Sequence, residues 1–375
     1  MAMISYLTTI RLKEGAVSHL ADDMKAAGIA KPLIITDAGV RAAGLLARVL
    51  AHLPQGDALP VFDGTPSNPT EEAAEAALAL YRTHHCDGLI AIGGGSPMDL
   101  AKAVAVMATH EGPLKTYATI EGGSPKITER VAPLIAVPTT SGTGSEVARG
   151  AILIVDDGRK LGFHNWHLMP RAAICDPELT LGLPPKLTAA TGMDALTHNI
   201  ESYLSPAYHP LCDGIALEGT RIAAAALLTA VQQPTNLQAR SDMMMSSMMG
   251  AIAFQKDLGA VHSCAHALGA VLDMHHGLAN ALMIDVVMAW NYEAVPEKFN
   301  ELAHVCHVKG GGSAFVPWLQ ELKLSIGITG NLSSHGVNAE HLARLVEIAT
   351  ADICHQTNPR PCTAADFEKL FKAAM

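Results

Sequence analysis

The sequence has no cysteine pair at the spacing of a metal or redox motif. Its seven cysteines stand at positions 86, 175, 212, 264, 306, 354 and 362, and none forms a Cys-x-x-Cys motif. An odd, dispersed set in a chain of 375 residues is typical of reduced, buried thiols. We therefore expect a cytoplasmic protein without a disulfide framework.

Basic clusters and long uncharged apolar runs are also missing. The chain has 26 Lys and Arg against 36 Asp and Glu, a formal net charge of −10, and no basic run that could follow a phosphate backbone. This argues against a nucleic-acid partner but leaves anionic small substrates open. No stretch reaches the roughly 18 to 20 apolar residues of a membrane span, and the N-terminus lacks the basic start of a signal peptide. We expect no membrane partner.

Short apolar runs alternate with helical stretches in the first half of the chain. Runs at residues 32–36, 58–62, 88–96 and 132–140 each lead into a turn rich in Gly, Thr, Asp or Pro. Residues 151–163 and 172–180 contain further strand-like runs joined by turns. This rhythm predicts βα units around a parallel, Rossmann-like sheet.

The second half has helical spacing and little strand-like material. The change falls at LGLPPK (181–186), where two prolines disfavour a continuous helix. We therefore predict an α/β domain over residues 1–181 and an all-helical domain over residues 182–375.

Two loops of the first half have the composition of a dinucleotide site. GGGSPMD (93–99) follows a buried-looking strand and opens a helix, so backbone N–H groups and the helix N-terminus can hold phosphate oxygens. It is not a GxGxxG motif, and a plain glycine-rich turn is the alternative. TTSGTGSE (139–146) adds hydroxyls and amides at the same expected sheet edge. Asp37 is placed to bind an adenosine ribose, which favours NAD over NADP; a turn-capping role is its alternative.

Four residues of the second half have the composition of a metal site. Asp194 and His198 are four residues apart, so on a helix they lie on one face, and His262 and His276 lie in a second segment. Three imidazoles and one carboxylate suit a divalent ion such as Fe²⁺ or Zn²⁺. The alternative is that these are ordinary members of a set of 18 histidines. The dinucleotide loops in the same chain favour the metal site.

These segments together resemble the iron-dependent (group III) alcohol dehydrogenases. The resemblance covers nearly the whole chain and lies in TDAG, GGGSPMDLAK, PLIAVPTTSGTGSEV, DPELTLGLP, ATGMDALTHNIESYLS, VHSCAHALG and HGLANALM. It implies a dinucleotide-binding α/β domain, an all-helical domain, and a metal ion that polarises the carbonyl or alcohol oxygen during hydride exchange with NAD.

The resemblance also implies roles for individual residues. Asp194, His198, His262 and His276 match the metal ligands, and His266 matches a histidine beside the substrate and nicotinamide, where we expect it to relay a proton. The positions that match contacts to the dinucleotide are Asp37, Gly94, Gly95, Ser96, Asp99, Thr139, Thr140, Thr143, Ser145 and Lys160.

Within that family the chain is most similar to the 4-hydroxybutyrate dehydrogenases. The cues include TYATIEGGS (116–124), AFQKDLGAVHS (253–263) and HQTNPRP (355–361). Lys256 stands where small neutral residues are common and is a candidate for binding a substrate carboxylate. The alternative is a solvated lysine beside Asp257. Arg149 and His164 are further candidates, and a structural ion pair is the alternative for Arg149.

Other functions are weighed against this one. Close variants are an iron-dependent dehydrogenase of uncharged primary alcohols or diols and a glycerol-dehydrogenase-like zinc enzyme. More remote are a dehydroquinate-synthase-like cyclase, which needs a Lys and Arg cluster that the helical half lacks, and a non-enzymatic NAD or metal sensor. The resemblance further implies a homodimer or larger homo-oligomer.

Overall fold

The computed structural model describes residues 8–54 and 56–375, which form two compact units. Of these residues, 8–140 and 144–182 belong to an α/β unit, and 141–143 and 183–375 belong to a helical unit. The chain passes from one to the other between Gly182 and Leu183, one residue after the predicted boundary. The loop of residues 141–143 is the exception, since it belongs to the helical unit although it follows a strand of the other.

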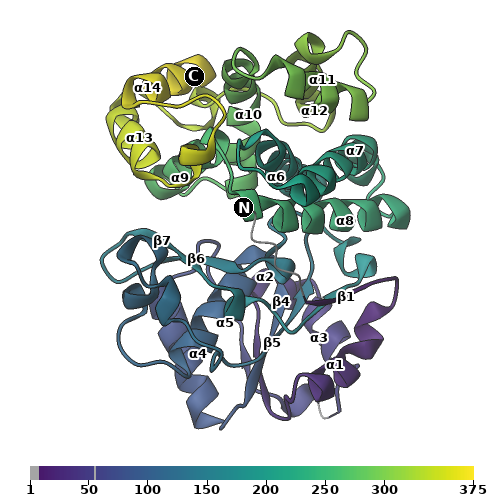
Figure 1. The fold of residues 1–375 in the computed structure, drawn as a ribbon. Helices are drawn as coiled ribbons and strands as arrows, with labels where there is room; N and C mark the ends of the chain where they lie inside the picture. The colour runs from purple at the N-terminus through teal and green to yellow at the C-terminus, as the bar shows by residue number, and fades with distance from the viewer. Residues whose placement is uncertain (1–7, 55) are drawn as a thin grey trace. The chain divides into compact units, whose positions relative to one another are not determined.

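The α/β unit is built on a six-stranded parallel sheet, as the sequence predicts (Figure 1). The strand order is β1-β8-β5-β4-β2-β3. The strands are β1 (Thr9–Leu12), β2 (Pro32–Ile35), β3 (Val61–Phe62), β4 (Gly88–Gly93), β5 (Leu134–Pro138) and β8 (Ala172–Cys175). The run at 58–62 therefore gives only a two-residue strand, preceded by a 3-10 turn at Gly56–Ala58.

Alternate residues of the strands enter two separate cores, because successive side chains of a strand point to opposite faces. Leu33 and Leu89 pack with α4 and α5, whereas Ile34 and Ile90 pack with α1 and α3. Covering both faces explains why these strands are continuously apolar rather than alternating. The helices are α1 (Leu20–Ala26), α2 (Ala38–Ala42), α3 (Leu45–Leu50), α4 (Glu71–Thr83) and α5 (Gly95–Met107).

A two-stranded antiparallel hairpin stands apart from the sheet. It joins β6 (Gly150–Ile154) to β7 (Lys160–His164), with Gly150 opposite His164. Both strands alternate between buried and half-buried residues, as expected of a hairpin with one face on the core. The sequence predicted the two strands but not their separation from the main sheet.

The helical unit has one apolar core, and most of its helices present small or aliphatic residues to it. The longest, α6 (Pro185–Leu204) and α7 (Pro210–Gln232), each begin with a proline in the first turn, where its missing N–H has no helical partner to lose. The others are α8 (Leu237–Ala253), α9 (Ala260–Leu272), α10 (His276–Tyr292), α11 (Pro296–Val305), α12 (Phe315–Ser325), α13 (Ala339–Ala351) and α14 (Ala364–Ala374).

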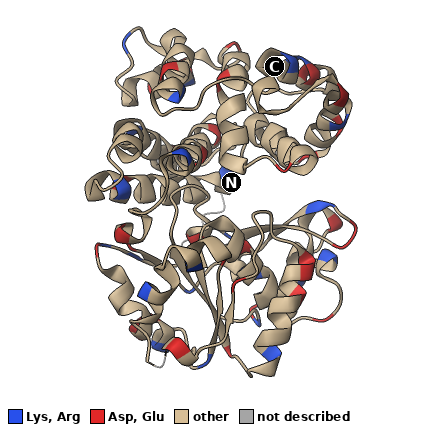
Figure 2. Ribbon diagram, turned by 180° about the vertical axis from the view of Figure 1, so that it is seen from behind, with Lys and Arg blue, Asp and Glu red and all other residues tan. Residues whose placement is uncertain are grey.

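Helix α7 is the one helix within residues 8–54 and 56–375 whose length and hydropathy would also fit a membrane span. Of its most apolar window, 44% is buried inside the protein, and the helix lies against α6 and α8. The buried hydrophobic residues of α7 belong to the apolar core of the helical unit. On the side seen in Figure 2, Lys and Arg are interspersed with Asp and Glu rather than gathered in one basic stripe.

Candidate metal and dinucleotide sites

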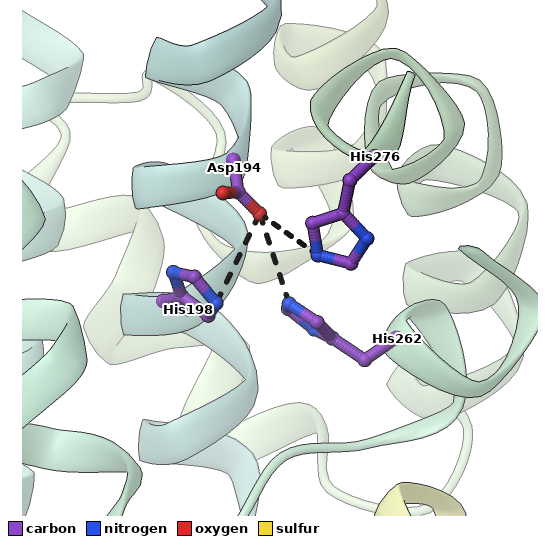
Figure 3. A group of neighbouring side chains, drawn as sticks. All are labelled: Asp194, His198, His262 and His276. Carbon is purple, nitrogen blue, oxygen red and sulfur yellow. Dashed lines mark ion pairs between the residues drawn. The ribbon is translucent and has the colours of Figure 1, made fainter. Parts of the chain in front are cut away.

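Three helices bring the four predicted metal ligands together in the helical unit. Asp194 and His198 lie one turn apart on α6, His262 lies in the first turn of α9, and His276 is the first residue of α10 (Figure 3). The Nε2 atoms of the three histidines lie 3.9, 3.8 and 3.4 Å from Asp194 Oδ1, in the order His198, His262, His276.

The spacing and protonation of these donors fit a bound cation. Donor atoms held about 2.1 Å from one ion in tetrahedral geometry lie roughly 3.4 Å apart, close to the three separations found here. Burial, reinforced by the nearby imidazoles of His198 and His276, lowers the pKa of His262 well below its ordinary value. The ring is therefore neutral and can present a lone pair, which metal binding requires.

The buried side chain of Glu201 contacts Nδ1 of His262, the ring nitrogen that faces away from Asp194. It lies on α6 two turns after Asp194, and one of its oxygens is 2.6 Å from His262 Nδ1. It also accepts the backbone N–H groups of Val261 and His262. Burial raises the pKa of Glu201 to about 8 against the opposing backbone donors, and a cation held by the four donors would favour its ionised form. A carboxylate on Nδ1 fixes the tautomer that leaves Nε2 free for a metal ion.

Asn280 completes the surroundings of the four donors. It lies one turn after His276 on α10, and its amide Nδ2 donates to Asp194 Oδ1 at 2.7 Å. The same nitrogen lies 3.3 Å from His276 Nε2 and 3.4 Å from His262 Nε2. The contact orients the carboxylate that all three histidines face.

His266 lies beside this cluster rather than in it. It is one turn after His262 on α9, and its ring is stacked on that of His276 with centroids 5.4 Å apart. Its Nδ1 lies 2.8 Å from Asp352 Oδ2. His266 and Asp352 group with Cys354 rather than with the four donors.

The turn between β4 and α5 forms the predicted glycine loop of the α/β unit. Gly93 has a φ of 151°, a conformation that side chains other than glycine's rarely adopt, and a Cβ there would lie 2.7 Å from Pro97 Cγ. Gly94 is the N-cap of α5 and has no side chain to cover the helix N-terminus, which Gly95 and Ser96 continue. Ser96 donates its hydroxyl to Ser67 O. The backbone N–H groups at this helix N-terminus suit an anionic group.

Asp37 caps a helix and also faces the glycine loop. Its Oδ1 accepts the backbone N–H of Val40 at 2.9 Å, so the capping alternative is realised. A Cβ on Gly93 would lie 3.4 Å from the other oxygen, Oδ2, which therefore points toward the loop. The two interpretations of this residue are compatible, because each uses a different oxygen.

A buried hydrogen-bond network holds the second of the two predicted dinucleotide loops. Asp99 accepts from the hydroxyl of Ser145 at 2.7 Å and from the backbone N–H of Ile152 at 3.0 Å. Lys102, fully buried, donates to Ser145 Oγ and to the carbonyls of Ser145, Ala148 and Gly150. Burial raises the pKa of Asp99 and lowers that of Lys102 to about 8. These two residues set the loop's shape.

The remaining predicted dinucleotide residues divide between the units. Thr139 follows β5 and donates its backbone N–H to Gly93 O, while the side chain of Thr140 faces Gly94. Lys160 begins β7 and donates to Asn68 Oδ1 at 2.9 Å. Thr143 belongs to the helical unit. The structure thus brings Asp37, the glycine loop and Thr139–Thr140 to one edge of the sheet.

Lys256 does not fit the substrate-binding role predicted for it, and it is not a solvated surface lysine either. Its side chain is 0% exposed, and its ammonium forms an ion pair with Asp213 of α7. A buried cation already neutralised by a carboxylate has no charge left for a substrate. The sequence placed Lys256 beside Asp257, but the partner that decides its role comes from another helix.

Arg149 immediately precedes β6, and His164 is the last residue of β7. The guanidinium carbon of Arg149 lies 4.9 Å from the centre of the Trp166 ring, and the structural ion pair proposed as its alternative is absent within the described residues. His164 Nδ1 lies 2.9 Å from Thr119 Oγ1. The backbone N–H of Asn165 donates to Arg149 O at 3.0 Å, which continues the hairpin pairing one position beyond Gly150 and His164.

No role was predicted from the sequence for four residues that contact these sites, namely Glu201, Asn280, Asp352 and Lys102. For two of them a signal existed. Glu201 follows Asp194 by seven residues and Asn280 follows His276 by four, and both spacings return to the same helix face. Asp352 and Lys102 act through contacts between distant segments, which spacing does not reveal.

Two family models match the chain, "Iron-containing alcohol dehydrogenase" over residues 8–177 and "Fe-containing alcohol dehydrogenase family, C-terminal" over residues 188–375. The 4-hydroxybutyrate dehydrogenase of Cupriavidus necator is 49% identical, with all of both chains covered.

Solved structures of similar enzymes have the same fold. A 1,3-propanediol oxidoreductase has a TM-score of 0.95 at 35% identity, over 100% of both chains. The sulfoacetaldehyde reductase of Bifidobacterium kashiwanohense, solved in complex with NAD⁺, has a TM-score of 0.90 at 29% identity, over 100% of this chain and 99% of that one. The chain therefore belongs to the iron-containing alcohol dehydrogenase family.

Proposed function

We propose that the protein interconverts 4-hydroxybutyrate and succinate semialdehyde. Its broader activity follows from its family: it is an NAD-linked, metal-dependent dehydrogenase of small alcohols and aldehydes. The observation that carries this function is the convergence of Asp194, His198, His262 and His276 from three helices onto one point. The substrate is inferred from the relative of 49% identity.

The four donors would hold Fe²⁺, and the same set also accepts Zn²⁺. Such an ion supplies Lewis acidity toward the reacting oxygen. The residues around the ion have separate roles. Glu201 and Asn280 orient His262 and Asp194 through the contacts described above. His266, outside the donor set, moves a proton between the substrate oxygen and solvent.

NAD would bind the α/β unit at the carboxyl ends of β4 and β5. The glycine loop offers its amides to the phosphates, and Asp37 Oδ2 is directed toward that loop. A carboxylate in this position binds ribose hydroxyls and repels a 2′-phosphate, which supports NAD rather than NADP.

The carboxylate of the substrate would be bound by Arg149 and His164 rather than by Lys256. Arg149 has no ion-pair partner within residues 8–54 and 56–375 and is held in place by the Trp166 ring. A guanidinium can form two parallel hydrogen bonds with a carboxylate. Such contacts distinguish a carboxylate-bearing aldehyde from an uncharged one.

The principal alternative is a dehydrogenase of uncharged primary alcohols or diols. It is supported by the structural similarity to a 1,3-propanediol oxidoreductase. Family membership favours either dehydrogenase over a cyclase of the dehydroquinate-synthase type and over a sensor without catalysis.

We also propose that the enzyme is a cytoplasmic homo-oligomer. Strand β1 forms one edge of the six-stranded sheet, and among residues 8–54 and 56–375 its single strand neighbour is β8. The other side of such a strand offers unpaired N–H and C=O groups, to which a second copy can add a strand. Sedimentation of the purified protein measures the number of subunits.

The test of the substrate follows NADH oxidation by the Fe²⁺-loaded protein with succinate semialdehyde and with butyraldehyde, with and without chelator. We expect a chelator-sensitive reaction with kcat/KM at least tenfold higher for the semialdehyde. Equal values for both aldehydes would retain the dehydrogenase and remove the carboxylate preference. Activity that survives complete metal removal would contradict the metal-dependent mechanism.

Substitution of Arg149 tests the proposed carboxylate contact. Arg149→Met should lower kcat/KM for succinate semialdehyde by about 10- to 100-fold, the range of a lost charged hydrogen bond, and leave butyraldehyde nearly unchanged. Arg171→Met, which removes an exposed arginine of the same unit, is the matched control. Equal losses on both aldehydes would show that Arg149 supports the fold of the hairpin rather than the substrate.

A further inference from the structure

We infer that Asp352 is a positioning residue for His266, fixing its tautomer and ring orientation for proton transfer. The inference rests on the proposed function, since it concerns the step that His266 performs. Asp352 follows the last residue of α13 and serves as the C-cap of that helix, so it reaches His266 from a segment far away in the sequence.

Asp352 is itself held rigidly. Its Oδ1 accepts the hydroxyl of Ser263 at 2.8 Å and the backbone N–H of Cys354 at 2.8 Å. The Ser263 hydroxyl oxygen in turn accepts the backbone N–H of His355 at 2.9 Å. With Oδ1 engaged on both sides, the other oxygen, Oδ2, is directed to His266 Nδ1. A carboxylate fixed in this way orients its partner instead of following it.

His266 is constrained on its other side by the metal-site histidines. Its ring stacks on His276 at an interplanar angle of 19° and meets the edge of His262, with centroids 6.1 Å apart. No contact between Nε2 and any residue in the described parts of the chain restrains that nitrogen. The ring therefore has its Nδ1 bound to Asp352 and its Nε2 available beside the proposed metal position.

This geometry suits both directions of the reaction. With Asp352 accepting from Nδ1–H, neutral His266 has a lone pair on Nε2 and can take the hydroxyl proton of the alcohol while hydride leaves its carbon for NAD⁺. In the reverse direction, hydride from NADH goes to the carbonyl carbon and the protonated ring gives its Nε2 proton to the oxygen, then regains one from solvent. Asp352 accepts from Nδ1–H of the neutral ring and of the protonated ring alike, so Nε2 is the nitrogen that takes and gives the proton.

The same arrangement occurs twice on α9. Glu201 binds Nδ1 of His262, and Asp352 binds Nδ1 of His266 one turn later. In both histidines the nitrogen that does not face the carboxyl group is Nε2. Only His262 lies within the four-donor set, so the same chemical device serves a metal ligand at one position and a proton carrier at the next.

The test uses Asp352→Asn, which keeps the shape but offers an N–H to Nδ1 and so favours the Nε2–H tautomer. We expect kcat to fall on the order of 100-fold, the range of general acid–base catalysis, with KM within about threefold. Metal content should stay equal to that of the unaltered protein. Glu347→Gln, which removes an exposed carboxylate from α13, is the matched control and should leave both constants unchanged.

A double-mutant cycle separates positioning from a general structural effect. If Asp352 acts through His266, adding Asp352→Asn to His266→Ala should change kcat by less than twofold. A further loss of similar size in that background would overturn the inference. So would loss of the bound ion in Asp352→Asn. If the unaltered protein bound two metal ions per chain and Asp352→Asn bound one, His266, Asp352 and Cys354 would form a second metal site. That result would also overturn the positioning role.

A spectroscopic measurement tests the inference independently of activity. Histidine-selective ¹⁵N labelling of the Zn²⁺-loaded protein reports the tautomer of each ring, and the signal lost in His266→Ala identifies His266. We expect an Nδ1–H tautomer that changes to Nε2–H in Asp352→Asn; an unchanged tautomer would refute the positioning role. If the tautomer changed as expected but the unaltered protein had no dehydrogenase activity, the contact of Asp352 with His266 would be supported and the proposed function would be rejected.

Discussion

The contact of Glu201 with His262 predicts an effect on metal affinity at the scale of one residue. Glu201→Gln replaces a charged acceptor on Nδ1 with an amide, which weakens the tautomer that presents Nε2. We expect the affinity for Zn²⁺ to fall about 10- to 100-fold. Competition with a chelator of known affinity measures it. Glu218→Gln, at an exposed position of α7, should leave the affinity unchanged, and equal effects of both substitutions would contradict the role of Glu201.

Glu146 predicts a pH dependence of stability. Burial raises the pKa of Glu146 to about 7, with its own backbone N–H and the nearby charge of Lys102 opposing the shift. Between about pH 4.5 and 7 the folded chain retains a proton that the unfolded chain has lost, so this group's contribution to stability falls as pH rises and is constant above. Glu146→Gln removes that loss, which amounts to roughly 3 kcal/mol at most.

Calorimetry of Glu146→Gln and the unaltered protein tests this sign. The variant should unfold at a higher temperature than the unaltered protein at pH 8, and the difference should shrink toward pH 4.5. The exposed Glu129 of the same unit provides the control, since Glu129→Gln should give no pH-dependent difference. If Glu146→Gln raised the unfolding temperature equally at pH 8 and at pH 4.5, the effect would come from packing and not from ionisation of Glu146.

The proposed metal ligands were easier to predict than the residues that contact them or their neighbours. Asp194, His198, His262 and His276 are recognisable because their types and motif positions are specific. Lys256 was misinterpreted because its role depends on Asp213, whose position next to it follows only from the packing of α7. Asp352 was missed for the same reason, since it meets His266 across 86 positions of sequence.

At the scale of elements, the close approach of α10 to α6 positions His276. A Cβ on Gly277 would lie 2.2 Å from the backbone oxygen of Ala190, so only glycine permits this approach. Gly277→Ala should push the start of α10 away from α6 and move His276 from Asp194. We expect weaker metal binding and a loss of stability of at least about 1 to 3 kcal/mol, the range of an overpacked core.

The matched control for that substitution is Gly214 on α7. A Cβ at Gly214 meets nothing within 4 Å, and alanine is the better helix former by up to about 1 kcal/mol. Gly214→Ala should therefore raise the unfolding temperature and leave the metal affinity unchanged. If Gly277→Ala kept the unfolding temperature and the metal affinity of the unaltered protein, the close contact between Gly277 and Ala190 would not position His276.

Elements were predictable where one physical signal dominated. Strands β4 and β5 are continuous apolar runs because both faces of the sheet are covered, and such runs are visible in the sequence. The run at 58–62 became the two-residue strand β3 because Pro60 cannot donate to a sheet and a 3-10 turn occupies Gly56–Ala58. The separation of the β6–β7 hairpin depends on which partner each strand finds, and a local pattern does not specify that.

At the scale of the whole molecule, the two sites belong to different compact units. The four metal donors and His266 come from the helical unit, whereas Asp37 and the glycine loop come from the α/β unit. Each ligand should therefore stabilise its own unit first. A ligand at about 1,000 times its dissociation constant adds about 4 kcal/mol to the stability of the state that binds it.

Hydrogen exchange of the holoenzyme, compared with and without chelator, resolves this difference. Removing the metal should increase amide exchange in α6, α9 and α10, because the proposed ligands of the ion come from these three helices. Strands β4 and β5 should change little. Removing NAD should have the opposite distribution, with the largest increase at Gly93–Ser96. A uniform increase throughout the chain on chelation would show that the units unfold as one, and that metal binding supports the dinucleotide site as strongly as its own.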